Sequence, residues 1–396
     1  HTNSGTLSSI AGGTNHSISS IGDCSFIGAG TTNTVEACWS IIGSGQNNCI
    51  RCDFASNSII GGGRDNTIYS NGGLPPTLAY YSTILGGCGN KVSDTGGSSN
   101  TACFSNIVGG QNNKVINCHS SIVGGTLNTG SGACSFIGGG ANNTAEGDFS
   151  SVVGGSNNLA LGSLSFAGGE LSLAEGAQSI AFGYAVTASA GASAAIGGAV
   201  NTVHSTALNS VALGGVSNNV YSCNAIVSGL SNCVCTAGSG GAKSSITSGE
   251  QNEVIAPFGL VVGNCNHVLG GSATSVRGGN IVGGCSNCVN GANSFGNLVV
   301  GNLNNVGNAS TSVGGAAAFG GGNGVFANGT VAIGENNCTI SGQPTYGHQS
   351  LLVGCENQNH FGASSIVGGF ASDGYGTNSI AFGLGATSAT GAQQYD

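Results

Sequence analysis

The stretch Ser120–Gly169 reads SSIVGGTLNTGSGACSFIGGGANNTAEGDFSSVVGGSNNLALGSLSFAGG, and it repeats one pattern. A polar residue, two apolar residues and a glycine pair recur, with the first glycine at Gly124, Gly138, Gly154 and Gly168. The steps between these glycines are 14, 16 and 14 residues. Self-similarity at a nearly fixed period is typical of repeat architectures. We therefore interpret most of the repeated residues as structural before considering any of them as part of a functional motif.

The same anchor runs through most of the chain. It reads SSIAGG at Ser8–Gly13, SIIGGG at Ser58–Gly63, NIVGG from Asn106 and SIVGG from Ser365. A second half-motif follows each anchor, an asparagine and then an apolar residue, as in Asn252–Val254. Short runs of Ile, Val, Leu and Phe bounded by turn residues favour β-strands, so we expect two short strands in each repeat.

Glycine pairs and asparagines suit the turns between these strands. Glycine permits positive φ, and asparagine tolerates the left-handed region while bonding to nearby backbone. One repeat then forms one coil of a solenoid, and like residues of successive coils stack roughly 4.8 Å apart. The sequence therefore predicts an all-β fold, a parallel β-roll or β-solenoid with about 14–16 residues per coil.

No linker or change of composition divides the chain, so we expect one continuous solenoid over residues 1–396. Longer steps between anchors mark insertions, which in solenoids project as loops from one face that is often the binding face. We place these insertions near residues 69–82, 93–103, 236–243, 270–279 and 340–349.

The composition excludes several classes of protein. The 396 residues include 76 glycines, 4 prolines and only 5% charged residues, without glycine at every third position, so a collagen helix is excluded. A hydrophobic content of 39% argues against disorder. The net charge is −9 and the six Lys and Arg residues form no cluster, so we expect no nucleic-acid partner. No apolar run approaches the roughly 20 residues that span a bilayer, and we expect no membrane insertion.

Sixteen cysteines point to an oxidising, extracellular setting, although buried cysteine also serves as a small apolar filler. Cysteines that are stacked one coil apart would have Cα atoms near 5 Å, a distance that a disulfide accepts, and bridges between chains fit equally well. The candidate pairs lie at equivalent repeat positions, or nearly so in the last case: Cys103 with Cys118, Cys265 with Cys285, and Cys24 with Cys38.

The sequence shows no convergent catalytic or metal-binding set. Its carboxylates lie mostly one to a coil beside turns, and its seven histidines are scattered. A glycan-cutting β-helix needs paired carboxylates, and structural zinc needs four closely placed ligands. We therefore expect no enzyme, no metal and no cofactor.

Aromatic residues collect in the expected insertions. Rings beside Asn, Gln and Asp suit carbohydrate recognition, although loop aromatics also pin a loop to its scaffold. The candidate glycan or receptor contacts are Tyr69, Tyr80, Tyr81, Tyr346 and His348.

Two stretches carry a resemblance to a known family. Ser179–Gly198 reads SIAFGYAVTASAGASAAIGG, and Ser379–Gly391 reads SIAFGLGATSATG. They are similar to the head repeats of trimeric autotransporter adhesins of the YadA type, in which SIAIG-like segments alternate with segments such as AxAxG, and similar repeats occur in viral and phage fibres. The resemblance implies a left-handed parallel β-roll in which three chains associate about a common axis and attach to a surface.

These observations predict an extracellular fibre module at a cell or virion surface. Its partners would be further copies of itself, as a homotrimer, and a surface glycan or host receptor held by the loops. Apolar residues on more than one face of a thin roll support association. One alternative is a filament or sheath subunit that is cross-linked through cysteines and binds no receptor, and a remote one is a glycan-processing β-helix enzyme.

We also expect two internal ladders. The apolar residue before each glycine pair would point inward, so that an aspartate at Val153 would cost several kcal/mol. The members of this apolar ladder are Val123, Ile137, Val153, Val262 and Val367. Stacked asparagines at one turn would bond along the axis, as in other stacked β structures. The members of the asparagine ladder are Asn113, Asn143, Asn158, Asn219 and Asn305.

Overall fold

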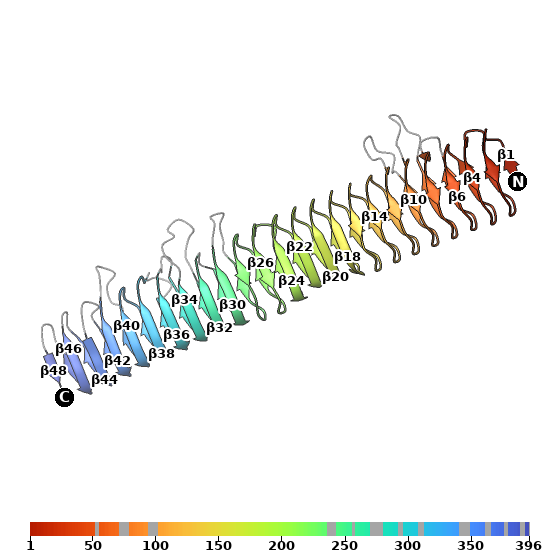
Figure 1. Ribbon diagram of the computed structural model, residues 1–396. Helices are drawn as coiled ribbons and strands as arrows, with labels where there is room; N and C mark the ends of the chain where they lie inside the picture. Colours follow the sequence, from red (N-terminus) through yellow and green to blue (C-terminus); the bar gives the residue numbers. More distant parts are fainter. Residues whose placement is uncertain are drawn as a thin grey trace. The chain divides into compact units, whose positions relative to one another are not determined.

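The computed structural model describes residues 1–51, 55–70, 79–93, 102–235, 243–255, 258–269, 280–291, 296–307, 313–339, 349–360, 366–375, 379–388 and 393–395. The chain divides into two compact units, His1–Gly197 and Gly198–Asp396. Both consist of short parallel strands stacked coil on coil, which confirms the predicted all-β solenoid (Figure 1). The insertions expected near residues 69–82, 93–103, 236–243, 270–279 and 340–349 lie wholly or largely outside the described residues.

In the first unit, each odd-numbered strand pairs in parallel with the next odd-numbered strand, and the even-numbered strands pair in the same way. We call the two layers the odd sheet and the even sheet. The odd sheet contains β1 (Thr2–Asn3), β3 (Ser17–Ile18), β5 (Thr34–Glu36), β7 (Cys49–Arg51), β9 (Thr67–Tyr69), β11 (Lys91–Ser93), β13 (Lys114–Val115), β15 (Thr129–Gly130), β17 (Thr144–Ala145), β19 (Leu159–Ala160), β21 (Leu173–Ala174) and β23 (Thr187–Ala188). The even sheet contains β2 (Ser9–Ile10), β4 (Phe26–Ile27), β6 (Ile41–Ile42), β8 (Ile59–Ile60), β10 (Thr83–Ile84), β12 (Asn106–Ile107), β14 (Ser121–Ile122), β16 (Phe136–Ile137), β18 (Ser151–Ser156), β20 (Phe166–Glu170), β22 (Ile180–Tyr184) and the start of β24 (Ala194–Ala199).

The second unit repeats this arrangement. Its odd sheet contains β25 (Thr202–Val203), β27 (Asn219–Val220), β29 (Cys233–Val234), β31 (Glu253–Val254), β33 (His267–Val268), β35 (Cys288–Val289), β37 (Asn305–Val306), β39 (Gly324–Val325), β41 (Cys338–Thr339), β43 (Gln358–Asn359), β45 (Asp373–Gly374) and β47 (Thr387–Ser388). Its even sheet contains β26 (Val211–Leu213), β28 (Ile226–Val227), β30 (Ser245–Glu250), β32 (Leu260–Asn264), β34 (Ile281–Cys285), β36 (Leu298–Asn302), β38 (Ala317–Gly321), β40 (Val331–Glu335), β42 (Leu351–Cys355), β44 (Ile366–Phe370), β46 (Ile380–Leu384) and β48 (Gln393–Tyr395).

Each coil runs from an even strand through one turn to an odd strand, and through a second turn to the next even strand. In the coil that begins at β14, the first turn ends at Asn128 and the second ends at Ser135. We call these the asparagine turn and the serine turn. At the asparagine turn Gly125 has φ 86°, and a Cβ there would collide with the carbonyl oxygen of Gly140 in the next coil. Glycine is therefore required at this point, and Gly125 stacks on Gly140 rather than on Gly139.

The stacking corrects the spacing that was read from the sequence. Ile122 pairs with Ile137 and Ile137 pairs with Val152, so both steps are 15 residues. Three consecutive glycines, Gly138–Gly140, follow Ile137, and the sequence alone aligned the wrong one of them.

The predicted apolar ladder is wrong for three of its members. Ile137 and Val367 are fully buried, but the side chains of Val123 and Val153 are each 46% exposed, and that of Val262 is also exposed. Side chains alternate between the two faces of a strand, so a one-residue slip turns each residue to the opposite face. The inward residues beside these three valines are Ile122, Val152 and Val261, all buried.

The asparagine ladder is confirmed for Asn113, Asn143 and Asn158, which are fully buried at the asparagine turn. The backbone N–H of Asn158 donates to Oδ1 of Asn143, 3.0 Å away in the preceding coil. The prediction is wrong by one residue for Asn219 and Asn305, which lie half-buried on the odd strands. The buried ladder residues at these turns are the preceding asparagines, Asn218 and Asn304.

A second ladder, not expected from the sequence, runs along the serine turns. The backbone N–H of Ser40 donates to Oγ of Ser25 at 3.0 Å, and the backbone N–H of Ser120 donates to Oγ of Ser105 at 3.3 Å. The Ser120 hydroxyl donates in turn to the carbonyl of Gly132 in the next coil, at 2.8 Å. Both turns of a coil are thus held by buried polar side chains that satisfy the backbone of a neighbouring coil.

Candidate functional site

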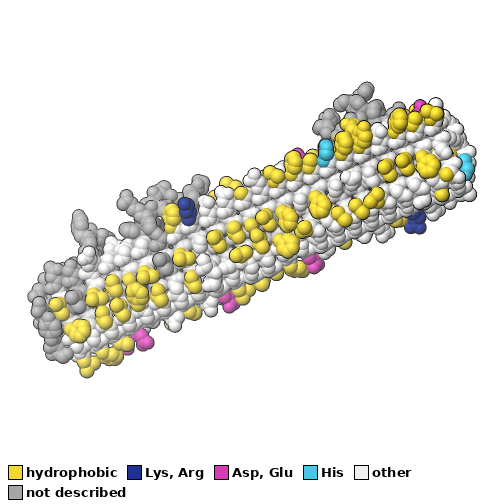
Figure 2. All heavy atoms as spheres, viewed as in Figure 1, with side chains coloured by type: hydrophobic (Ala, Val, Ile, Leu, Met, Phe, Trp, Pro, Cys, Tyr) yellow, Lys and Arg dark blue, Asp and Glu magenta, His cyan; other side chains and the backbone are white. Residues whose placement is uncertain are grey.

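The outer face of the even sheet carries exposed apolar side chains, and they lie in rows along each unit (Figure 2). The residues on either side of the buried one point outward, because side chains alternate along a strand. We call them the first and second outer positions, and together they form the even face. Exposed apolar residues at the first outer position are Phe26, Ile41, Ile59, Phe136, Ile180, Ile226, Leu260 and Leu351. Those at the second outer position are Leu85, Val108, Val123, Val153, Phe182, Leu213, Val262, Val300, Ile333 and Phe382.

A second exposed feature lies at the serine turns of the first unit. The residue before the ladder serine has a positive φ, and in several coils it is aromatic. We call these residues the aromatic column: Trp39, Tyr81, Phe104, His119 and Phe149. The backbone N–H of Phe104 donates to the carbonyl of Tyr80 in the preceding coil at 3.0 Å, and the N–H of His119 donates to that of Cys103 at 2.9 Å. These bonds keep the column in line from coil to coil.

Rings on adjacent coils of this column stack on one another. The centroids of Tyr81 and Phe104 are 5.1 Å apart with the planes 11° from parallel, and those of Phe104 and His119 are 5.2 Å apart at 13°. Tyr80 meets Tyr81 and Phe104 edge-on, at 5.3 and 5.6 Å. The stack remains open to solvent, since Tyr81 and Phe104 are both exposed.

The fold does not require aromatic residues at this position. Asn57, Asn209 and Asn224 take the same place in other coils, as expected for a left-handed residue. A bulky side chain in that conformation costs roughly 1–2 kcal/mol, and Trp39 remains 63% exposed, so burial does not offset the cost. Leu7 and Leu164 take the same place and are also exposed, so the left-handed backbone belongs to the serine turn itself, and the aromatic rings distinguish these coils.

The structure brings together only part of the predicted glycan-contact set. Tyr80 and Tyr81 lie in the aromatic cluster, whereas Tyr69 lies in β9 with the ammonium of Lys91 5.8 Å from its ring centroid. Tyr346 and His348 lie outside the described residues. Sequence reasoning missed Trp39, His119 and Phe149, although a signal was available. Each member of the column directly precedes the serine of an anchor, as in Trp39-Ser40, Phe104-Ser105 and Phe149-Ser150.

The predicted cysteine pairs have different outcomes. Cys103 and Cys118 occupy equivalent places in adjacent coils, since the N–H groups of His119 and Cys134 donate to their respective carbonyls. Cys265 and Cys285 do not stack, because Cys285 pairs in register with Asn264 and Cys265 lies one residue further along the turn. This pairing is therefore wrong, and the physical reason is again a one-residue slip.

Cys24 and Cys38 also differ by one position. Cys24 has φ 54° and takes the left-handed place in its serine turn, which Trp39 fills in the next coil. Cys38 precedes that place, and its thiol donates to the carbonyl of Ile21 at 3.2 Å. Both are free cysteines, so the predicted bridge is not formed.

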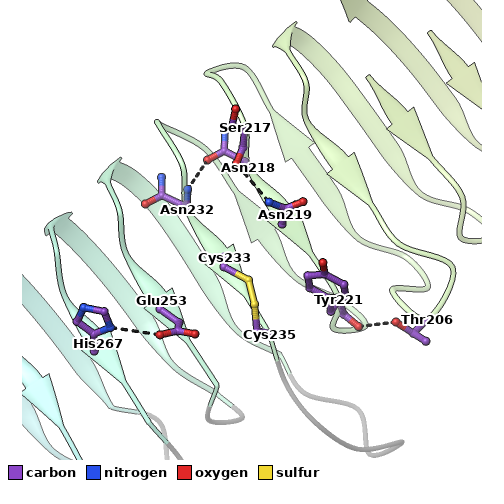
Figure 3. Close-up of a disulfide and its surroundings, with 10 residues drawn as sticks. All are labelled: Thr206, Ser217, Asn218, Asn219, Tyr221, Asn232, Cys233, Cys235, Glu253 and His267. Atoms are coloured by element: carbon purple, nitrogen blue, oxygen red, sulfur yellow. Dashed lines mark hydrogen bonds and ion pairs between the residues drawn. A yellow bond between two sulfur atoms is a disulfide. The ribbon is translucent and has the colours of Figure 1, made fainter. Parts of the chain in front are cut away.

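One disulfide joins Cys233 in β29 to Cys235, with Cα atoms 5.6 Å apart (Figure 3). Residues i and i+2 of a strand point to the same face, so a Cys-Val-Cys sequence on an odd strand places both thiols on its outer side. Sequence reasoning looked for partners one coil away and missed this pair. In the neighbouring coils Nδ1 of His267 lies 3.2 Å from Oε2 of Glu253, within hydrogen-bond distance (Figure 3).

Charged groups in the described part of the chain are few, and they are exposed or half-buried. Glu36 pairs with Arg51 at 3.3 Å and Arg64 with Asp65 at 3.3 Å, and such surface pairs contribute at most about 1 kcal/mol. The described residues contain no group of three or more His, Cys, Asp or Glu side chains placed to hold a metal ion. They also contain no helix with the length and apolarity needed to cross a membrane.

The thiols of Cys49, Cys288 and Cys338 project from the outer side of odd strands and are half-buried. Burial raises the pKa of each of these thiols above its ordinary value. For Cys49 burial outweighs the nearby Arg51 guanidinium, which lowers the pKa. These thiols are therefore poorly suited to nucleophilic chemistry near neutral pH.

No protein-family model matches this sequence, and no curated protein matches it.

Proposed function

We propose that this chain is an extracellular structural and adhesive fibre module that works as a homotrimer of left-handed β-rolls. The even face carries the proposal, because it presents exposed apolar residues on coil after coil of both units. Soluble monomers rarely expose continuous apolar patches of more than a few hundred Å². Association of three chains about an axis parallel to the stack would cover this face within each unit.

The aromatic column supports an adhesive role. Its rings are exposed and held by a rigid scaffold, and each takes a conformation that asparagine or glycine adopts at lower cost. Aromatic rings of this kind form platforms for the apolar faces of sugars, so a glycan on a cell or virion receptor is the proposed ligand.

Mass measurement tests the trimer. Light scattering on the purified chain should give three times the 38.1 kDa of one chain. Val108→Asp and Val123→Asp, both on the even face, should lower the mass without loss of β structure, because they place charges in the interface. Thr144→Asp, on the outer side of the odd sheet, is the control. A monomeric parent would contradict the proposal.

Glycan-array binding tests the adhesive role independently. We expect binding by the parent chain and its loss in the double variant Tyr81→Ser, Phe104→Ser. An array without any signal for the parent, or equal binding by the variant, would remove the support for glycan attachment.

The cysteine-linked filament is the second candidate. The exposed thiol of Cys285, at the end of an even strand, is accessible to another chain. That candidate requires polymers which loosen in reductant, and trimers that are unchanged in reductant would exclude it.

A further inference from the structure

The outer side of the odd sheet gathers positive charge in the first unit. Arg51, Lys91 and Lys114 all project there, from β7, β11 and β13, so three of the chain's six Lys and Arg residues share one face. Tyr69 pairs in register with Arg51, and the ammonium of Lys91 lies 5.8 Å from its ring centroid. We call these four residues the cationic patch. They are far apart in the sequence, and only the stacking of coils brings them together.

The two lysines of the patch have no partner charge. Lys91 pairs in register with Lys114, on adjacent strands that lie about 4.8 Å apart. Their neighbours in the same column are Thr67 and Thr129, both neutral. Within the part of the chain that the structure describes, neither lysine takes part in an ion pair, whereas Arg51 is already paired with Glu36. Like charges directly opposite one another destabilise a sheet, so the lysine pair carries a cost.

The fold does not account for this cost. The same outer place is threonine in other coils of the first unit, and threonine favours strands whereas lysine is depleted in them. Those threonines are Thr34, Thr67, Thr129 and Thr144. Solubility does not account for the lysines either, because the net charge of the chain is −9 and two cations bring it closer to zero. An anion from outside the chain would relieve the repulsion.

We infer that the cationic patch binds an acidic polysaccharide, one that carries sulfate or carboxylate groups. Each lysine ammonium has three donors on a flexible stem, so Lys91 and Lys114 together hold one anionic group of the sugar chain. The ring of Tyr69 lies beside them and contacts the apolar face of an adjoining sugar. The hydroxyls of Thr67 and Thr129, in the same column, are donors and acceptors for sugar hydroxyls.

The small number of charges favours a glycan over other polyanions. Proteins that bind nucleic acid or anionic membranes use clusters of roughly four to ten cations. The patch has two unpaired ones on a chain that is otherwise acidic, which suits a polymer with widely spaced charges. This inference rests on the proposed adhesive role only in taking a glycan as the ligand. It adds a second contact surface, on the odd sheet, which stays open when the even faces associate.

Calorimetry on the full chain tests the chemistry of the ligand. Heparin, hyaluronate and dextran supply a sulfated, a carboxylated and a neutral polysaccharide. We expect binding to at least one of the two charged polymers, none to dextran, and loss of binding in about 1 M salt, where the screening length falls to about 3 Å. Binding to neither charged polymer would overturn the inference. Duplex DNA that binds as tightly as the better polysaccharide would also overturn it.

A pair of substitutions tests the residues. The double variant Lys91→Thr, Lys114→Thr restores the threonine of the neighbouring coils, so circular dichroism should show it folded. We expect the dissociation constant for the charged polymer to rise by about tenfold, since each exposed charge contact accounts for a factor of up to about five. The control Arg64→Thr, Lys243→Thr removes the same charge from exposed sites outside the patch and should bind as the parent does. Equal losses in both double variants would show that net charge alone matters and would overturn the inference.

A gain of binding gives a test that does not depend on loss. Thr129→Lys extends the lysine column by one coil, and we expect the dissociation constant to fall by about twofold to fivefold. Thr187→Lys occupies the same outer place on β23, away from the patch, and is the matched control. Equal affinities for these two variants would overturn the inference.

The aromatic column separates this inference from the proposed function. The double variant Tyr81→Ser, Phe104→Ser should keep its binding to the charged polymer. If that variant loses all binding while the lysine variant binds as the parent does, the inference is refuted and the adhesive role of the aromatic column stands. A chain that binds no glycan of any kind would refute both.

Discussion

At the scale of single residues, the ladder asparagine Asn143 satisfies three backbone groups. Nδ2 of Asn143 donates to the carbonyl of Gly139 in its own coil at 2.9 Å and to that of Gly155 in the next coil at 3.0 Å. Oδ1 accepts the N–H of Asn158. A buried backbone group left without a partner costs about 1–3 kcal/mol, so this amide is difficult to replace.

Asn143→Ala should therefore destabilise the first unit by about 2–4 kcal/mol. Asn142→Gly is the control, because Asn142 is exposed, has φ 54°, and glycine adopts that conformation without strain. Urea unfolding followed by circular dichroism measures both. Equal midpoints for the two variants would show that the ladder amide carries no stability.

Two neighbouring valines give the sharpest test of side-chain direction. Val152 is fully buried and Val153 is 46% exposed. Val152→Asp buries an unpaired charge and should cost about 4 kcal/mol or more, whereas Val153→Asp should cost less than about 1 kcal/mol of folding free energy. Thermal unfolding measures both variants at a concentration where each is monomeric. A lower melting temperature for Val153→Asp than for Val152→Asp would contradict the assigned register.

The raised thiol pKa values predict a pH dependence. At a given pH Cys49, Cys288 and Cys338 hold less thiolate than an ordinary thiol, so iodoacetamide should label them more slowly than the exposed Cys285. The unfolded chain releases these protons more readily than the folded one, so their contribution to stability is lost as pH rises above about 8.5. Peptide mass spectrometry against pH measures labelling, and equal rates at pH 8 would contradict the prediction.

At the scale of elements, the serine turn combines a structural and a functional position. The ladder serine is buried and bonds to its neighbours, while the residue before it is exposed and left-handed. The hydrogen bonds between strands do not involve the side chain of that exposed residue. Aromatic side chains can therefore occupy this position while the coil keeps its pairing with its neighbours. The cost is confined to the local strain of each bulky residue.

Phe149→Asn should relieve this strain. Phe149 has φ 58° and is 59% exposed, and asparagine tolerates the left-handed region, so we expect a gain of about 1 kcal/mol in unfolding free energy. Binding to glycans should weaken at the same time if the column is the adhesive surface. Denaturation and array binding on one preparation measure both, and a destabilised variant would show that the ring contributes packing that outweighs its strain.

At the scale of the whole molecule, stability is distributed between adjacent coils. Each coil bonds to the coil before and the coil after it, so a defect acts mainly on its nearest neighbours. Each of the two compact units has its own buried column of apolar residues and its own run of ladder asparagines.

Hydrogen exchange should therefore respond locally to a buried charge. Val152→Asp should speed amide exchange in the coils around β18, and Ala332→Asp should do so around β40 in the second unit. Each variant should leave the coils of the other unit protected as in the parent. Uniform loss of protection along the chain would show that it unfolds as one cooperative body.

The sequence by itself determined that each repeat forms one coil of a β-solenoid, because its glycines, asparagines and short apolar runs recur at a period that only stacked coils explain. It also located the buried Asn113, Asn143 and Asn158, since a repeated amide beside a turn has few other uses. The extracellular trimer, its ligand and its handedness stay predictions.

Tertiary structure alone decided which face each side chain takes. Runs such as Gly138–Gly140 permit several alignments of one coil on the next, and a slip of a single residue exchanges inside for outside, as it did for Val123 and Val153. The same slip separated Cys265 from Cys285. The sequence places each member of the aromatic column directly before an anchor serine, but only the stacked coils show that these residues are exposed, left-handed and aligned.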